Sequence, residues 1–152
     1  MSPLLRPATL ADLPDLLDMQ EAGSVLALGH IFPQDEHPFP RIVVHDRWVA
    51  EIADPEIEVL VAGAVEAFAA IRGNELLHFG TAVATWGSGL AAVVHDELVG
   101  RFAGTPTARL RVFEENRRAR RFYEKMGWTS TERRTRTAFP PRPVLVEYEL
   151  NL

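Results

Sequence analysis

The chain has 152 residues, of which 47% are hydrophobic, 24% charged and 9% aromatic, as in a folded globular protein rather than a disordered or fibrous one. Its formal net charge of −5 argues against a nucleic-acid partner, and the absence of cysteine excludes a disulfide framework, a cysteine zinc site and a thiolate nucleophile. The first residues lack a basic stretch followed by an apolar core, and the longest apolar run, 59–65, is far shorter than the roughly 18 residues of a membrane span. We therefore expect one domain over residues 1–152, located in the cytoplasm and without a membrane partner.

The first third of the chain predicts a strand followed by two helices. Residues 4–6 form a short strand candidate, and Thr9 with Asp12 resembles a capping box that opens a helix with the leucines of 10–17 on one face. Residues 29–40 contain three prolines and no periodicity, which indicates a structured loop. A helix over 41–52 is expected to follow this loop.

The remainder of the chain interleaves strands with helices. Three strands at short intervals, 57–62, 64–71 and 75–83, indicate antiparallel hairpins. They are followed in order by a helix after Gly89, a strand over 108–113, a helix over 116–126 and strands over 129–136 and 144–150. This pattern predicts a single α/β domain in which helices cover a mixed sheet.

A glycine-rich turn connects the third of these strands to a helix, with the sequence Trp86-Gly87-Ser88-Gly89-Leu90-Ala91. Glycines allow the main chain to turn tightly, and the free N–H groups at the start of a helix attract an anion. The segment therefore indicates a phosphate site made of main chain. An ordinary strand-to-helix turn explains the same residues equally well.

A second segment carries a more specific order of residues. Strand 108–113 is followed by Asn116, Ala119, Phe122-Tyr123 and Gly127-Trp128. Together the two segments resemble the GCN5-related N-acetyltransferase family, which has an acyl-CoA pyrophosphate loop of the form Gln/Arg-Gly-x-Gly-x-Gly/Ala and a later Asn…Ala…Tyr…Gly-Phe/Trp signature. The order of elements agrees with that family over nearly the whole chain. Trp86 departs from the pattern, because it stands where the family has Gln or Arg.

This resemblance implies a mixed, mostly antiparallel sheet of about seven strands covered by about four helices. It also implies an acetyl-CoA-dependent N-acetyltransferase that transfers the acetyl group directly to a primary amine of a small molecule or peptide. The alternative is a catalytically silent CoA-binding or protein-interaction module with the same fold. A homodimer is left open.

The resemblance places acetyl-CoA, as a cosubstrate without a metal ion, along the third strand of the hairpin region and the turn after it. The implied cofactor-binding residues are Phe79, Gly80 and Thr81 for the pantetheine arm, the main-chain N–H groups of Gly87, Ser88, Gly89, Leu90, Ala91 and Ala92 for the pyrophosphate, Asn116 for the arm and Arg118 for the 3′-phosphate. Three of these positions have structural alternatives. Gly80 also reads as a packing glycine, Asn116 as a helix cap, and the basic cluster 117–121 as a solvated helix face.

Acetyl transfer requires a neutral amine, stabilisation of the oxyanion and a proton for the departing thiolate. Tyr123 occupies the position of the family's general acid, although helical spacing alone would make it a core tyrosine. Glu75 is the implied base, acting through water, with His78 or water itself as alternatives. Strand alternation puts Glu75 and His78 on opposite faces unless a distortion near Gly80 changes the register. Other members of the family place a glutamate where this chain has Arg111.

The loop over 30–39 corresponds to the acceptor side in the resemblance. Asp35 and Glu36 are expected to attract a cationic amine, Phe32 or Phe39 to pack against its apolar part, and His78 to contact it. An ordinary surface loop is the alternative. His30, Asp35 and His37 have irregular spacing for metal ligands, and the chemistry needs no metal.

Overall fold

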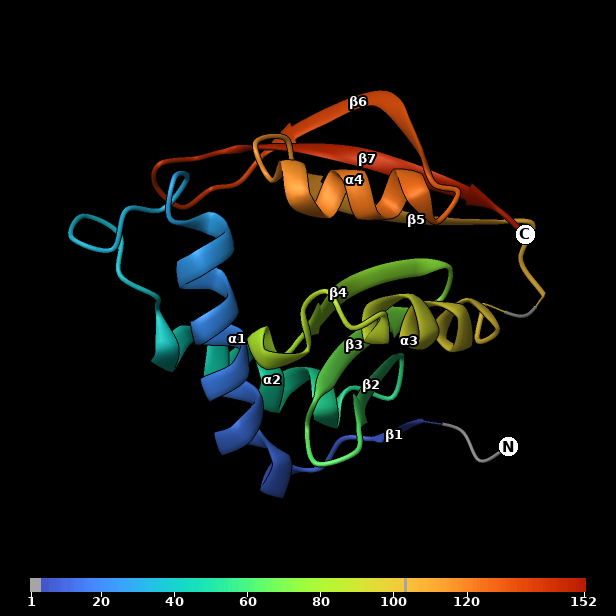
Figure 1. Ribbon diagram of the computed structural model, residues 1–152, viewed down its shortest axis with the longest axis horizontal. Helices are drawn as coiled ribbons and strands as arrows, with labels where there is room; N and C mark the ends of the chain where they lie inside the picture. The colour runs from blue at the N-terminus through green and yellow to red at the C-terminus, as the bar shows by residue number, and fades with distance from the viewer. Residues whose placement is uncertain (1–3, 103) are drawn as a thin grey trace.

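The computed structural model describes residues 4–102 and 104–152, which form one α/β unit around a seven-stranded mixed sheet (Figure 1). The strand order is β1-β2-β3-β4-β5-β7-β6, and neighbours are antiparallel except for β4 and β5. The strands are β1 Leu5–Pro7, β2 Ile57–Ala62, β3 Ala67–Arg72, β4 Glu75–Thr81, β5 Thr107–Phe113, β6 Thr129–Arg136 and β7 Val144–Asn151. The helices are α1 Leu13–Leu28, α2 Arg41–Ala53, α3 Leu90–Val99 and α4 Arg117–Lys125, with short 3-10 turns at Leu10–Asp12 and Val83–Thr85. The predicted fold class is confirmed.

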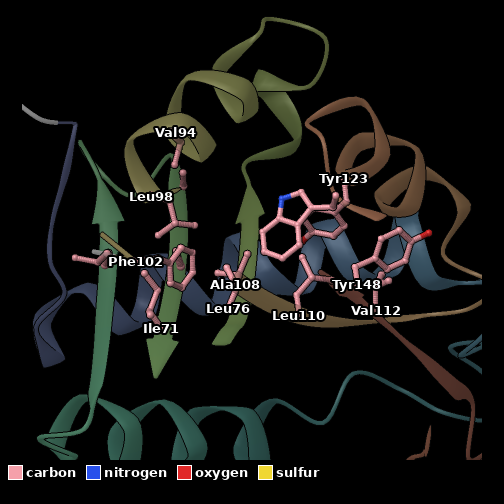
Figure 2. Packing of buried hydrophobic residues seen from close by; sticks show 14 of the residues in the cluster. Ile71, Leu76, Val94, Leu98, Phe102, Ala108, Leu110, Val112, Tyr123 and Tyr148 are labelled. Carbon is pink, nitrogen blue, oxygen red and sulfur yellow. The ribbon is translucent and has the colours of Figure 1, made fainter. Parts of the chain in front are cut away.

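Two hydrophobic cores lie on the two faces of the sheet. Alternation along β3 divides its side chains, so that Ala69 and Ile71 enter one core while Phe68 and Ala70 enter the other. The first core is covered by α3 and α4, and Figure 2 shows Val94 and Leu98 of α3 over the sheet with Tyr123 of α4 beside the strands. The second core is covered by α1 and α2. A ligand that bound between two strands of the sheet would therefore meet α3 and α4 on one face and α1 and α2 on the other.

The first helix begins later than the leucine spacing predicts. The Asp12 carboxylate accepts a hydrogen bond from the Thr9 main-chain N–H at 2.9 Å, as in the expected capping box. The residues between them form a 3-10 turn, and Leu10 is 59% exposed. Pro14, which lacks an N–H group, suits the first turn of a helix, and α1 begins at Leu13.

Two strands are shorter than their apolar patterns. The strand expected over 64–71 begins only at Ala67, because Val65 adopts a left-handed φ of 60° in the preceding turn. The strand expected over 75–83 ends at Thr81 and continues as a 3-10 turn. The apolar residues beyond each strand are turn residues that lie against the protein rather than in the sheet.

The feature that positions the candidate site is the separation of β4 from β5. These parallel strands pair only at Glu75 with Arg109 and at Leu76 with Leu110. Beyond Leu76 the two strands diverge, as Figure 1 shows. The edge of β4 from Leu77 to Thr81 is thus left without pairing to β5 in the described part of the chain.

Among residues 4–102 and 104–152, none of the helices combines the length and the apolar character needed to cross a membrane.

Candidate active site

A cavity of about 550 Å³ lies between the diverging strands. Its walls come from β4 and β5, from α1 and α4, and from the connection between β6 and β7. Four groups of residues expected from the sequence line it, namely the edge of β4, Asn116, Arg118 and Tyr123. The cavity therefore brings together residues that are up to about 50 positions apart in the sequence.

The glycine-rich turn forms the end of the cavity next to α3. Gly87 and Gly89 have φ angles of 81° and 88°, which side chains rarely adopt, and Gly89 is the residue before the first turn of α3. The Ser88 hydroxyl accepts a hydrogen bond from the Leu90 N–H at 3.3 Å. Gly87 to Gly89 are exposed beside the cavity and Ala91 lines it. The N–H groups of the first turn point out of the helix end, where they suit an anion.

Trp86 holds an arginine at this same end. Its indole Nε1 donates a hydrogen bond to the Thr81 carbonyl at 3.2 Å, and the Arg118 guanidinium carbon lies 3.6 Å from the centre of the indole ring. Partial burial lowers the pKa of Arg118, which stays far above neutral because guanidinium groups remain protonated in proteins. Trp86 therefore places a positive charge at the cavity in the position where the related pattern carries Gln or Arg.

Gly80 is required by packing. A Cβ atom at this position would lie 2.5 Å from the ring of Phe68, which covers the main chain of β4 from the side of the second core. The packing alternative for Gly80 is thus correct for this face. The edge of β4 at Gly80 still lines the cavity, as do Phe79 and Thr81.

A β-bulge changes the register of β4. His78 pairs with Ala70 and Leu76 with Ile71, so Leu77 is an extra residue opposite adjacent residues of β3. Glu75 pairs with Arg72, which shares the face of Ala70. The expectation that Glu75 and His78 lie on opposite faces is therefore wrong, because the bulge returns His78 to the face of Glu75, toward α1 and α2.

Asn116 is the N-cap of α4. Its side-chain oxygen accepts a hydrogen bond from the Ala119 N–H at 3.2 Å, and the residue also lines the cavity. The basic cluster of α4 divides by role. Arg120 donates to the Tyr148 hydroxyl and to the Glu114 carbonyl, both at 2.9 Å, and is structural, whereas Arg118 faces the cavity.

Tyr123 combines burial with an unpartnered hydroxyl. The residue is 8% exposed and belongs to the first core, and it also lines the cavity. Among the described residues its hydroxyl makes no hydrogen bond, and burial raises the pKa of the phenol above its ordinary value. The hydroxyl therefore keeps its proton at neutral pH and is available to a ligand in the cavity.

Sequence reasoning did not identify a polar cluster contributed by α2. His78 Nε2 lies 3.0 Å from the carboxylate of Glu51, which is 9% exposed, and the His78 ring packs on Trp48. Arg47 lies on the cavity wall with its Nε 3.3 Å from the same carboxylate. The spacing of Arg47 and Glu51, four residues apart beside a tryptophan, is the signal that could have indicated them.

The acceptor loop is only partly at the cavity. Asp35 and Glu36 are exposed and lie outside the cavity wall, while Phe32 packs on Phe113 and Phe139, which line it, with ring centres 5.4 and 6.0 Å apart. His30 Nε2 contacts the Glu115 carbonyl at 2.7 Å. Within the described ranges, no three His, Cys, Asp or Glu side chains are arranged to hold a metal ion.

Several solved N-acetyltransferase structures are similar to this fold. A GCN5-related N-acetyltransferase from Rhodopseudomonas palustris superposes with a TM-score of 0.78 at 15% identity, covering 100% of this chain and 97% of that one. The PaiA N-acetyltransferase from Thermoplasma acidophilum, solved with coenzyme A, has a TM-score of 0.70 at 17% identity and full coverage of both chains. Spermidine N-acetyltransferase from Vibrio cholerae, solved with CoA and spermine, has a TM-score of 0.68 at 14% identity, covering 97% and 94%.

Neither the family models nor the curated proteins give a match to this sequence. At identities below 20% the structural similarity defines the fold. The chain has the GCN5-related N-acetyltransferase fold, as the resemblance of its two motifs implied.

Proposed function

We propose that this protein is an acetyl-CoA-dependent N-acetyltransferase that transfers the acetyl group directly to a primary amine. The observation that carries the proposal is the cavity between β4 and β5. Its lining includes Trp86 and Ala91, on either side of the turn before α3, and also Tyr123, Glu75 and His78, so it would accommodate an anion at the start of α3 and the reacting groups in one space. The similarity to N-acetyltransferases of the same fold supports this assignment as an analogy.

The open edge of β4 suits the pantetheine arm of CoA. The pyrophosphate would bind at the N-terminus of α3, and the amide groups of the arm would pair with main-chain groups of Phe79 to Thr81 like an added strand. From Thr81 to Leu77 the strand rises by roughly 13 Å, at about 3.3 Å per residue. The thioester would then lie near the bulge at Leu77, where the two strands come together.

The hydrogen-bond donor to the leaving group and the proton acceptor for the amine would act from opposite faces of the sheet. Tyr123 approaches the opening from the face of α3 and α4, where its hydroxyl would donate a hydrogen bond to the sulfur of the leaving thiolate. Glu75 and His78 approach from the face of α1 and α2, where either would accept the proton of the amine, Glu75 through water. The amine would attack the thioester carbon, the C–S bond would break, and CoA would leave as a thiolate that accepts the hydrogen bond of Tyr123 and then takes up a proton from solvent.

Thermal unfolding tests the cofactor assignment. CoA that binds only the native state should raise Tm, by mass action. Gly89→Asp should abolish this shift, because a side chain at φ 88° strains the turn and its negative charge repels the pyrophosphate. Gly63→Asp is the matched control, since Gly63 also has a positive φ of 55° and open space around it but lies in the turn between β2 and β3.

Saturating CoA that leaves the Tm of the wild type unchanged would contradict the proposal. A Tm shift without CoA release from acetyl-CoA in the presence of a broad panel of amines would instead indicate a silent CoA-binding module.

A further inference from the structure

Arginines outnumber acids on the part of the cavity that faces α1 and α2. The charged side chains that line the cavity are Arg47, Arg111, Arg118 and Glu75, with His78 as the titratable neighbour. Arg118 is stacked on Trp86 at the cofactor end. The other two arginines are left for the acceptor, and the acids of the loop, Asp35 and Glu36, do not reach the wall.

Arg111 is placed beside the candidate base by strand alternation. Its neighbours Leu110 and Val112 enter the first core, so Arg111 faces the opposite side of β5, toward α1 and α2. Its Nε lies 3.8 Å from the nearer carboxylate oxygen of Glu75. A positive group and a candidate proton acceptor thus stand next to each other in the compartment that the amine would enter.

Arg47 is incompletely satisfied where it stands. Its Nε and Nη2 atoms are buried without a hydrogen-bond partner among the described residues, and its contact with Glu51 is too poorly aligned for a hydrogen bond. Glu51 is also engaged by His78, so one carboxylate serves two cationic or titratable groups. Burial lowers the pKa of Arg47, although its ordinary value is so high that the charge persists. The Arg47 side chain as a whole is 39% exposed, so an anion in the cavity would meet the guanidinium, and a rotation of the side chain would turn its unpartnered nitrogens toward that anion.

We propose that the acceptor carries a carboxylate close to its reactive amine, and that Arg47 and Arg111 bind this carboxylate while Glu75 or His78 receives the proton of the amine. The inference rests on the proposed function and names its substrate class. Because Arg111 adjoins Glu75, the amine and the carboxylate must be separated by only a few bonds, as in an amino acid. A polyamine has no anionic group and would bind less favourably, because it would face two arginines and a single carboxylate on this part of the cavity wall.

Matched acceptors test this inference directly. CoA release from acetyl-CoA is measured with a set of L-amino acids, with the corresponding amino-acid amides, in which the carboxylate is replaced by a neutral group, and with spermidine. A hydrogen bond to a charged group corresponds to a difference of about 10- to 150-fold in affinity. We expect the acids to exceed their amides by this factor in kcat/KM, chiefly through KM, and to exceed spermidine.

Variants of Arg47 test whether this arginine causes the preference for an acid over its amide. Arg47→Met keeps an unbranched apolar stem without the charge and should reduce the preference for an acid over its amide, with Arg111 supplying what remains. Arg47→Lys, which keeps the charge without the planar fork, should retain more of the preference. Arg121→Met is the matched control, because Arg121 is an exposed arginine of α4 that does not line the cavity. It should leave the preference unchanged.

The possible outcomes distinguish failure of the carboxylate site from failure of the proposed acetyltransferase activity. Acetylation of amides or spermidine as efficiently as of amino acids, or an undiminished preference in a folded Arg47→Met protein, overturns the carboxylate site and leaves the acetyltransferase intact. Failure of every amine overturns both, with the CoA-induced Tm shift of the wild type showing whether cofactor binding survives.

Discussion

Replacing Tyr123 by phenylalanine separates catalysis from packing more cleanly than any other single change in this site. The substitution removes one hydroxyl and keeps the ring against Phe122 and Trp128, whose ring centres lie 5.6 and 6.1 Å away. The hydroxyl makes no hydrogen bond with the described residues, so no partner is left unsatisfied by its removal. We therefore expect the free energy of unfolding to change by less than about 1 kcal/mol, because the hydroxyl loses no protein partner and its oxygen reaches the cavity rather than being fully buried.

The expected loss of turnover follows from the acidity of the phenol. Burial raises the pKa of Tyr123 above its ordinary value of 10, whereas a thiol has an ordinary pKa of about 8.5. Complete proton transfer from the phenol to the thiolate is thus uphill, and the hydroxyl acts mainly by donating a hydrogen bond to the sulfur as charge develops. A hydrogen bond to a charged group contributes roughly 1.5–3 kcal/mol. Tyr123→Phe should lower kcat about 10- to 150-fold.

The assay is CoA release at saturating acetyl-CoA and acceptor, measured across pH for both proteins together with their Tm and their affinity for CoA. A lower kcat with unchanged Tm and CoA affinity supports the assignment. Wild-type kcat at every pH would remove Tyr123 from the mechanism, and a large fall in Tm would show that the hydroxyl is structural instead.

Three further changes test other parts of the structure. Gly80→Ala should destabilise the protein by about 1–3 kcal/mol through overpacking against Phe68, and urea unfolding should show Gly80→Ala costing less in a Phe68→Leu background. Trp86→Leu should weaken CoA binding about 2- to 30-fold by releasing Arg118 from the indole ring, and titration calorimetry should show no such effect in an Arg118→Ala background. Hydrogen bonds from a neighbouring arginine and from a main-chain N–H lower the pKa of Asp12 to about 2. Its stabilising contribution is present above the unfolded pKa of about 3.9 and should be lost as pH falls toward 2, a dependence that Asp12→Asn removes from plots of Tm against pH.

The elements were predictable where a periodic pattern coincided with a local signal for the end of the element. The strand over 57–62 and the helix after Asn116 have such signals and were placed closely. On α3 the residue types do not show which side chains are buried, because Val93 is 55% exposed while His95 is buried. His95 is buried because it accepts a hydrogen bond from the Trp128 indole at 2.9 Å. This partner lies 33 residues away, so no local sequence pattern predicts the contact.

The candidate site was predictable where it depended on main chain and less so where it depended on side chains from separate elements. The glycines of the turn before α3 and the cap residue Asn116 could be located because their conformations demand particular residue types. The bulge at Leu77 has no such requirement, and it reversed the expected relation between Glu75 and His78. Arg47 became a site residue through the contact of α2 with His78 of β4. The spacing of Arg47 and Glu51 marks them as a pair, but it does not show that the pair faces β4.

Because β4 and β5 pair at only two residue pairs, the sheet consists of two halves joined at one end, namely β1-β2-β3-β4 and β5-β7-β6. The angle between these two halves can change without breaking main-chain hydrogen bonds between β4 and β5, because the two strands are not paired after Leu76 and Leu110. Contacts between side chains of the two halves resist opening, such as the Trp128 hydrogen bond to His95. The loop after α1 adds contacts through His30 at Glu115 and Phe32 at Phe113. That loop links the two halves of the sheet at the end where β4 and β5 are farthest apart, so its length and composition limit how far this end can open.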